Sequence, residues 1–190
     1  MKIEILENNS KSLRFMLKDA TNAYANALRR IATNHVSCFA IENVTFYENS
    51  SVMFDEYIAH RLGLIPIFTP NGYDEKDVIL FTLEATGPKT VYSKELETAD
   101  KEVKVANANL PIIKLASEQR IRIDCKAVLG TGAKHAKFQP GLITYDQVDE
   151  NAFNFYIETF GQMPPKEIIN KAIENIKEEV KDIEKSVKKL

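Results

Sequence analysis

Residues that could bind a metal or attack a substrate are few in this sequence, and they lie far apart. Cys38 and Cys125 are its two cysteines, whereas zinc and iron–sulfur sites take cysteine ligands from closely spaced pairs. The three histidines, His35, His60 and His135, have no second ligand at a metal-site spacing. We therefore expect no cofactor in this chain, and specifically neither an iron–sulfur cluster nor zinc.

Two further segments have the composition of ligand-binding loops but not the context. The acidic run at 74–77 offers oxygen ligands for Mg²⁺, yet it lies in a predicted turn with no glycine-rich phosphate loop in the chain. The Gly-Thr-Gly segment at 130–132 follows a predicted strand without opening an apolar-periodic helix. No serine, cysteine or lysine has a base or oxyanion motif beside it. We expect no catalytic residues, and a small enzyme with an unrecognised site stays an alternative.

The composition is that of a globular chain with no overall attraction to nucleic acid. Of its 190 residues, 44% are hydrophobic and 27% are charged, and the formal net charge is −2. A local excess of basic residues lies between positions 114 and 137. Its members are Lys114, Arg120, Arg122, Lys126, Lys134 and Lys137. We interpret this segment as solvated surface, with a protein contact and a nucleic-acid contact as the alternatives.

The sequence shows no signal for secretion or membrane insertion. Its N-terminal segment alternates charged with apolar residues and lacks the continuous apolar stretch of a secretion signal. No run of about 18 apolar residues follows. We expect a cytoplasmic protein that does not bind membranes.

Apolar periodicity predicts strands at both ends of the chain and a β-rich middle. Residues 3–5 and 13–17 alternate apolar with polar side chains around a turn, which predicts a hairpin. Further strands are expected at about 36–47, 78–83, 103–106, 121–129 and 153–159. The two ends read as one α/β unit that the β-rich middle interrupts.

Two short helices are predicted before the middle region. The first runs from Asp19 or Thr21 to about Asn34, and the second covers about 52–62. In the first helix, Tyr24, Leu28, Ile31 and His35 fall at helical spacing on one side. The second helix carries Phe54, Ile58 and Leu62 on one face. Acidic residues in the first turn of the second helix and basic residues in its last turn suit the helix dipole.

A long helix is predicted from Pro165 to the end of the chain, and its apolar residues repeat as a heptad seam. They are Ile169, Ile173, Ile176, Val180, Ile183, Val187 and Leu190. At ~1.5 Å per residue the helix spans about 39 Å, which is longer than a domain of this size usually covers. We expect the seam to pair with a helix of another chain, the alternative being packing on this chain's own sheet with a frayed end.

Three ordered segments resemble a known family. They are NALRRI at 26–31, AIENV at 40–44 and DEYIAHRLGLIP at 55–66, with GAKHAKF at 132–138 and the terminal helix extending the match. Together they closely resemble the D-subunit family of archaeal RNA polymerases, related to the third-largest subunit of eukaryotic polymerase II and the N-terminal domain of bacterial alpha. The resemblance covers nearly the whole chain and is least informative at 70–110.

The resemblance implies an α+β fold and a role in assembly. A discontinuous alpha-like dimerisation domain at 1–46 and 151–190, which includes the long C-terminal helix, would be interrupted by a β-rich insert domain at 47–150. In this family the chain is a non-catalytic assembly-scaffold subunit of DNA-directed RNA polymerase. It pairs with the small subunit L, meets small subunits N and P and the large catalytic subunits, and reaches DNA only indirectly. A homodimeric alpha-type adaptor is the alternative.

The resemblance also implies three sets of contact residues. The candidate large-subunit interface is Asn26, Arg29, Arg30, Asp55, Glu56, His60 and Arg61. The candidate heterodimer interface is Ile169, Ile173, Ile176, Val180, Ile183 and Val187. The candidate contact loop of the insert domain is Lys134, His135, Lys137 and Phe138.

Two features distinguish this chain from some of the proteins it resembles. Many archaeal relatives carry cysteine-ligated iron–sulfur clusters, and the eukaryotic form has a cysteine-rich zinc loop, whereas this chain has two cysteines. We expect no tethered DNA-binding domain after the last helix, which argues against bacterial alpha. The sequence therefore resembles the cluster-free archaeal branch.

Overall fold

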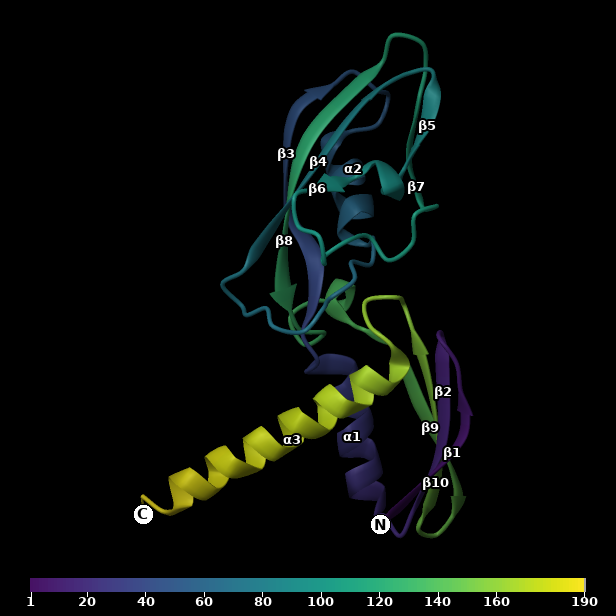
Figure 1. Cartoon of the computed structure of the whole chain (residues 1–190), viewed down its shortest axis with the longest axis vertical. Helices are drawn as coiled ribbons and strands as arrows, with labels where there is room; N and C mark the ends of the chain where they lie inside the picture. The colour runs from purple at the N-terminus through teal and green to yellow at the C-terminus, as the bar shows by residue number, and fades with distance from the viewer. Residues whose placement is uncertain (190) are drawn as a thin grey trace. The chain divides into compact units, whose positions relative to one another are not determined.

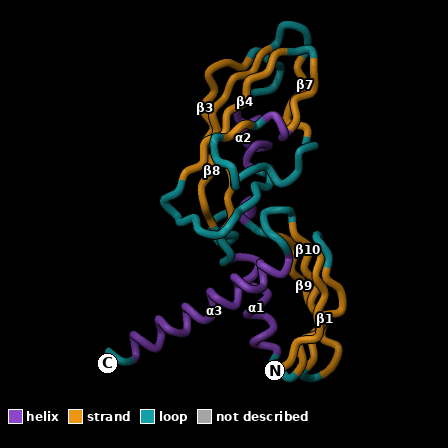
Figure 2. The backbone as a smooth tube through the Cα atoms, in the orientation of Figure 1, coloured by secondary structure: helices purple, strands orange, loops and turns teal. Residues whose placement is uncertain are grey.

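The computed structural model describes residues 1–189, so Leu190 of the predicted seam lies outside the described residues. The chain forms two compact units, drawn in Figures 1 and 2. Unit 1 combines Met1–Ser37 with the chain from Thr131 onward, and unit 2 is Cys38–Gly130. Helices and antiparallel sheets in one chain confirm the predicted α+β fold.

The limits of the units differ from the predicted domain limits at 46/47 and 150/151. Strand β3 (Cys38–Asn49) pairs along its length with β8 (Arg120–Gly130), so residues 38–46 belong to unit 2. Strand β9 (Gly141–Asp149) pairs with β10 (Ala152–Thr159) and belongs to unit 1. The limits implied by the resemblance were not based on strand pairing, and the limit at 46/47 therefore cuts through β3.

Unit 1 is a four-stranded antiparallel sheet with helices on one face (Figure 2). Its strand order is β1 (Lys2–Asn8), β2 (Ser12–Lys18), β10 and β9, and β1 with β2 forms the predicted hairpin. The buried residues of the two central strands are Leu13, Phe15, Leu17, Phe153, Phe155 and Ile157. The stacked rings of Phe15 and Phe155 lie 4.9 Å apart between centroids. Alternation of apolar and polar residues thus gives the sheet one buried face.

Helix α1 (Asn22–Asn34) begins where a capping residue was predicted. The Thr21 hydroxyl accepts a hydrogen bond from the Tyr24 N–H at 3.3 Å. Of the four residues noted at helical spacing, only Leu28 is buried, and its buried neighbours on the helix are Ala25 and Ala32. Tyr24 and Ile31 are half-buried and His35 is exposed. The two alanines let the helix approach its neighbours closely, which leaves the larger side chains on its flank.

Helix α3 (Pro165–Val187) begins at the predicted proline. Its buried residues lie in its first part and are Pro165, Ile168, Ile169 and Ala172. The Asn175 side chain donates a hydrogen bond of 2.8 Å to the carbonyl of His35, where α1 ends. The helices therefore meet near the middle of α3, and the remainder of α3 extends past the core of unit 1 (Figure 1).

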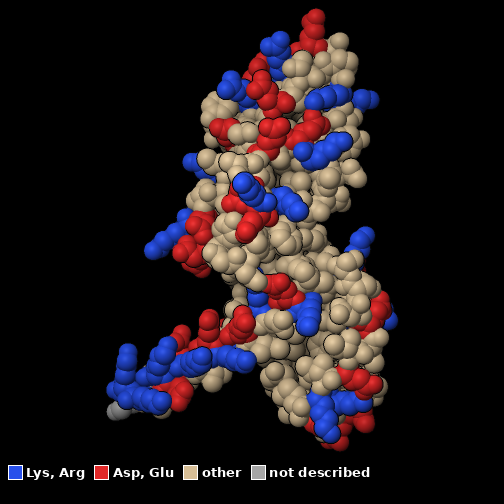
Figure 3. Space-filling model, in the orientation of Figure 1, with Lys and Arg blue, Asp and Glu red and all other residues tan. Residues whose placement is uncertain are grey.

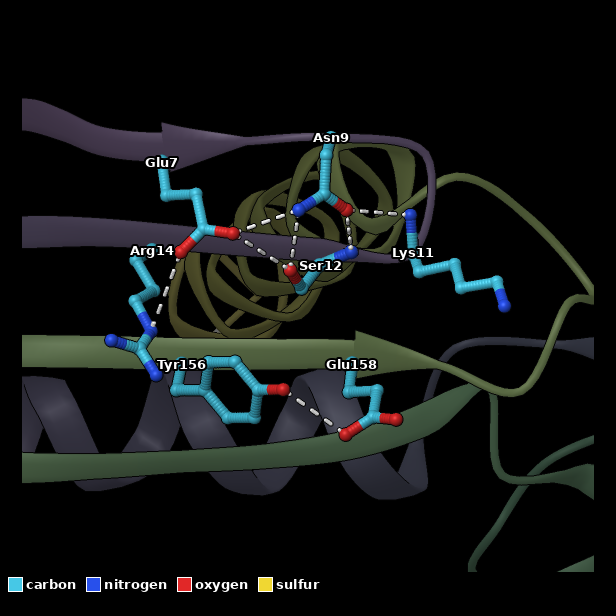
Figure 4. Close-up of polar contacts among 7 residues, drawn as sticks. All are labelled: Glu7, Asn9, Lys11, Ser12, Arg14, Tyr156 and Glu158. Atoms are coloured by element: carbon cyan, nitrogen blue, oxygen red, sulfur yellow. Dashed lines mark hydrogen bonds and ion pairs between the residues drawn. The ribbon is translucent and has the colours of Figure 1, made fainter.

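Polar side chains lie on the outer face of the unit 1 sheet, and Figure 4 draws several of them. The Arg14 guanidinium lies 5.0 Å from the centroid of the Tyr156 ring and 3.8 Å from the Glu7 carboxylate. The Tyr156 hydroxyl donates to Glu158 at 3.1 Å, and this hydrogen bond raises the pKa of Tyr156. These exposed pairs contribute little to stability, and they mark the solvated side of the sheet.

Unit 2 contains two further sheets. One has the order β3, β8, β4 (Val78–Thr86) and β6 (Glu97–Thr98), and the other pairs β5 (Lys89–Tyr92) with β7 (Pro111–Leu115). The strands predicted at 78–83 and 121–129 are confirmed. The strand at 103–106 is wrong, since only Val105 forms a bridge, with Ile67. Strands β5, β6 and β7 were not predicted because they are short, and β7 begins at a proline.

Helix α2 (Asp55–Gly63) packs on β3 and β7. Of the three residues predicted to share one face, Ile58 and Leu62 are buried, but Phe54 is 71% exposed. Phe54 has extended backbone and precedes the helix, so helical spacing does not apply to its side chain. Short 3-10 helices occur at Ser93–Glu95 in unit 2 and at Ala136–Phe138 in unit 1.

Candidate functional site

The heptad seam on α3 divides into a buried start and an exposed end. Ile169 is buried, and Ile173 and Ile176 are half-buried. Val180, Ile183 and Val187 are each about three-fifths exposed, at 59%, 65% and 61%. Within residues 1–189, nothing covers this end of the seam. Regularly spaced large apolar side chains on an exposed helix face are typical of an interface with another chain.

The candidate residues of α1 lie together near the middle of that helix. The Arg29 guanidinium donates to the Asn26 side-chain oxygen at 3.0 Å, and the Thr33 hydroxyl donates to the Arg29 carbonyl at 2.9 Å. Arg29 is half-buried, whereas Arg30 is exposed. Arg30 is therefore the more accessible of the two cations, and Arg29 is held by its own helix.

The candidate residues of α2 lie together in unit 2. Asp55 and Glu56 occupy its first turn and His60 and Arg61 its last, as predicted. Arg61 donates through Nε to the Ile112 carbonyl at 2.9 Å and through Nη2 to the Pro111 carbonyl at 2.6 Å. Its guanidinium thus attaches α2 to β7, a structural task that the sequence did not reveal.

The candidate contact loop at 134–138 lies in unit 1, not in the insert, because the chain returns to unit 1 at Thr131. Phe138 is fully buried, so its predicted role as an exposed contact is wrong. The ammonium groups of Lys134 and Lys137 lie 5.6 and 5.2 Å from the centroid of its ring. The Nδ1 of His135 accepts the Lys137 N–H at 3.1 Å. Lys134, His135 and Ala136 are the exposed part of the loop.

The basic segment at 114–137 is divided between the two units. Arg120, Arg122 and Lys126 alternate with buried residues along β8, and all three are exposed. The Arg122 guanidinium lies 5.6 Å from the centroid of the Tyr47 ring, whose hydroxyl donates to Asp124 at 2.9 Å. Figure 3 shows basic and acidic side chains interspersed over the face of the molecule that it draws. This arrangement matches the interpretation of the β8 residues as a solvated strand face.

The surroundings of Cys125 are not those of a nucleophile. Cys38 and Cys125 are both buried and unbridged. Burial, with a smaller effect of Asp124, raises the pKa of the Cys125 thiol to about 12, so it stays protonated at neutral pH. In the described part of the chain, no three His, Cys, Asp or Glu side chains form a group suited to a metal ion. No helix among residues 1–189 is both long and apolar enough to cross a membrane.

Two exposed apolar groups were not predicted. Ile3 and Ile5 on β1 are more than half exposed, although periodicity assigned them to a half-buried hairpin. Phe54 and Tyr57 at the start of α2 are exposed with ring centroids 6.3 Å apart. Alternation predicts which face of a strand is apolar but not whether a second layer covers it, so no sequence signal separates these residues from core residues.

Comparisons with known proteins agree with this architecture. The family model described as the RNA polymerase Rpb3/RpoA insert domain matches residues 41–148. A DNA-directed RNA polymerase subunit Rpo3 from Methanocaldococcus jannaschii is 49% identical over 86% of this chain and 83% of its own length. This chain belongs to the Rpo3 family of RNA polymerase subunits.

Other members of the Rpo3 family differ in how much of their length is matched. The Pyrococcus furiosus protein is 45% identical over 76% of this chain and 58% of its own length. The Halobacterium salinarum protein is 30% identical over 97% of this chain and 96% of its own length. The chain thus spans little more than half of some relatives and nearly all of others.

Proposed function

We propose that this Rpo3-family chain is a non-catalytic scaffold of RNA polymerase that pairs through α3 with the small subunit L. The exposed end of the heptad seam carries the proposal. Val180, Ile183 and Val187 remain exposed in the chain by itself, and burying each against a partner would contribute about 1.5–3 kcal/mol. Pairing would then create a composite surface on which small subunits N and P and the large catalytic subunits assemble.

The exposed cation of α1 and the acidic start of α2 are the proposed contacts with large subunits. Arg30 is exposed, and guanidinium groups form bidentate pairs with carboxylates at interfaces. Asp55 and Glu56 are exposed at the other end of α2 from Arg61. The near-neutral charge of the chain suits a subunit that touches proteins while its partners hold DNA.

Co-expression with the candidate subunit L, followed by native mass measurement, tests the pairing. We expect a one-to-one complex from the wild-type chain. The double variant Val180→Asp, Ile183→Asp should weaken it about a hundredfold or more, because two carboxylates would be buried in an apolar contact. Both positions are mostly exposed, so the chain itself should stay folded.

A matched control places the same two carboxylates on the polar face of α3. Lys181→Asp with Lys185→Asp alters exposed residues of the same turns and should leave pairing close to wild type. Equal loss in both double variants would contradict the seam as the interface. A stable, monodisperse homodimer of the chain by itself would instead support the alpha-type adaptor.

A further inference from the structure

The edge strand β1 turns an apolar face toward the helices without being covered by them. Ile3 lies opposite Leu17 and Ile5 lies opposite Phe15 across the β1–β2 pair. Side chains directly opposite on neighbouring strands lie on the same face of a sheet. Leu17 and Phe15 are buried, whereas Ile5 is 58% exposed. The apolar face of the sheet therefore extends onto β1, beyond the part that the helices cover.

A groove of about 150 Å³ lies between this strand and α3. Its lining is mainly apolar and includes Ile3, Ile5, Phe15, Ile169 and Ile173. A cavity of about this volume lined by Leu, Ile and Phe side chains accepts a benzene-sized molecule. The groove is thus large enough for one aromatic ring or one branched aliphatic side chain, and it has few polar groups to hold a polar ligand.

The occupant follows from the continuity of the groove with the seam on α3. Ile169 and Ile173 line the groove and are also the first two members of the seam. A helix that covers Ile176, Val180 and Ile183 therefore borders the groove directly. Lys166 at the rim adds a positive charge, which favours a carboxylate beside the inserted side chain.

We infer that the groove between β1 and α3 receives one bulky apolar side chain, aromatic or branched aliphatic, from the subunit that covers the α3 seam. This inference rests on the proposed pairing with subunit L and adds β1 to the interface. Anchors of this kind, inserted in an apolar pocket, contribute much of the binding energy of protein interfaces. Ile3 and Ile5 then become interface residues, which explains large apolar side chains on an open strand.

Variants at two neighbouring positions of β1 test the inference, through measurement of their affinity for subunit L. Ile5→Asp puts a carboxylate into the groove and should weaken binding of subunit L at least tenfold. Leu6→Asp is the matched control, because Leu6 is 50% exposed, lies at the bulge of the same strand and does not line the groove. It should change the dissociation constant less than twofold. Equal loss in the two variants, or no loss for Ile5→Asp, would overturn the inference.

A photo-crosslinking side chain at Ile3 identifies the occupant. In the complex with subunit L it should label one residue of that subunit next to an aromatic or branched aliphatic side chain. Labelling of a second copy of this chain, or of a large subunit, would overturn the assignment. If Val180→Asp, Ile183→Asp abolishes pairing while Ile5→Asp binds like wild type, only the groove assignment fails. If the wild-type chain does not bind subunit L, the proposed function fails with it.

Discussion

The two units differ in how completely their own residues enclose an apolar core. In unit 2, β3, β8, β4 and α2 surround a continuous core that includes Phe39, Phe81 and Leu83. In unit 1 the sheet is covered over β2 and β10, but β1 and the second half of α3 leave large apolar side chains exposed. A unit that completes its core should be stable by itself, whereas a unit that leaves it open depends on a partner.

The largest expected effect is a core truncation in unit 2. Phe81→Ala removes a ring that is 1% exposed and should lower the free energy of unfolding of unit 2 by about 3–5 kcal/mol. Leu80→Ala on the exposed face of the same strand is the control and should cost far less. Denaturant titration of the full chain measures both. A similar cost for the two variants would contradict a closed core in unit 2.

The sequence predicted most elements of unit 1, although not strand β9, and it predicted poorly which apolar residues of that unit are buried. The hairpin, the start of α1 after Thr21, the start of α3 at Pro165 and the strand at 153–159 depend on local signals, and the structure contains them all. Burial depends on contacts between distant segments. The seam period is the same at Ile169, which is buried, and at Ile183, which is exposed, so periodicity could not separate them.

The candidate contact residues show the same limit. The resemblance made Phe138 part of a contact loop and placed Arg61 at an interface. The distant residues that surround these two side chains leave no local signal in the sequence. The structure buries Phe138 and directs Arg61 to carbonyl groups of β7. Asp55 and Glu56 are exposed, as a contact requires, and their role stays a prediction.

Partner binding should stabilise the two units unequally. A protein that covers the α3 seam and β1 binds folded unit 1, so at a hundredfold excess over its dissociation constant it should stabilise that unit by about 2.7 kcal/mol. Unit 2 should unfold at the same temperature with or without it. Hydrogen exchange resolved along the chain separates the units. An equal gain in amide protection at Phe81 in unit 2 and Phe155 in unit 1 on adding subunit L would contradict unequal stabilisation of the two units.

Arg61 tests whether unit 2 also needs its polar attachments. Arg61→Ala removes the two hydrogen bonds to the Ile112 and Pro111 carbonyls and should destabilise unit 2 by about 1.5 kcal/mol. His60→Ala, at the neighbouring exposed position, should be close to neutral. Thermal unfolding compares them. If Arg61→Ala leaves stability unchanged and instead weakens polymerase assembly, Arg61 is a contact residue and not an attachment between α2 and β7.

The smallest expected effect is the pH dependence of the stability that the Asp100 carboxylate contributes to unit 2. Backbone N–H groups of Val103 and Glu102, with the Tyr73 hydroxyl, donate to the Asp100 carboxylate and hold its pKa below the ordinary value of 3.8.

The pKa of Asp100 is lower in the folded chain than its ordinary value. The Asp100 carboxylate therefore contributes fully to the free energy of unfolding when the pH is above the ordinary pKa. This contribution is lost as the pH falls through the folded-state pKa. Asp100→Asn should therefore be less stable than wild type at neutral pH, and the difference in melting temperature between the two proteins should become smaller in acid. Melting temperatures of the two proteins at about pH 7, 4 and 3 measure that difference. A constant difference would mean that Asp100 acts through its hydrogen-bond geometry and not through its charge. The turn would then stabilise the closed core of unit 2 independently of pH, and acid would affect the two units through other groups.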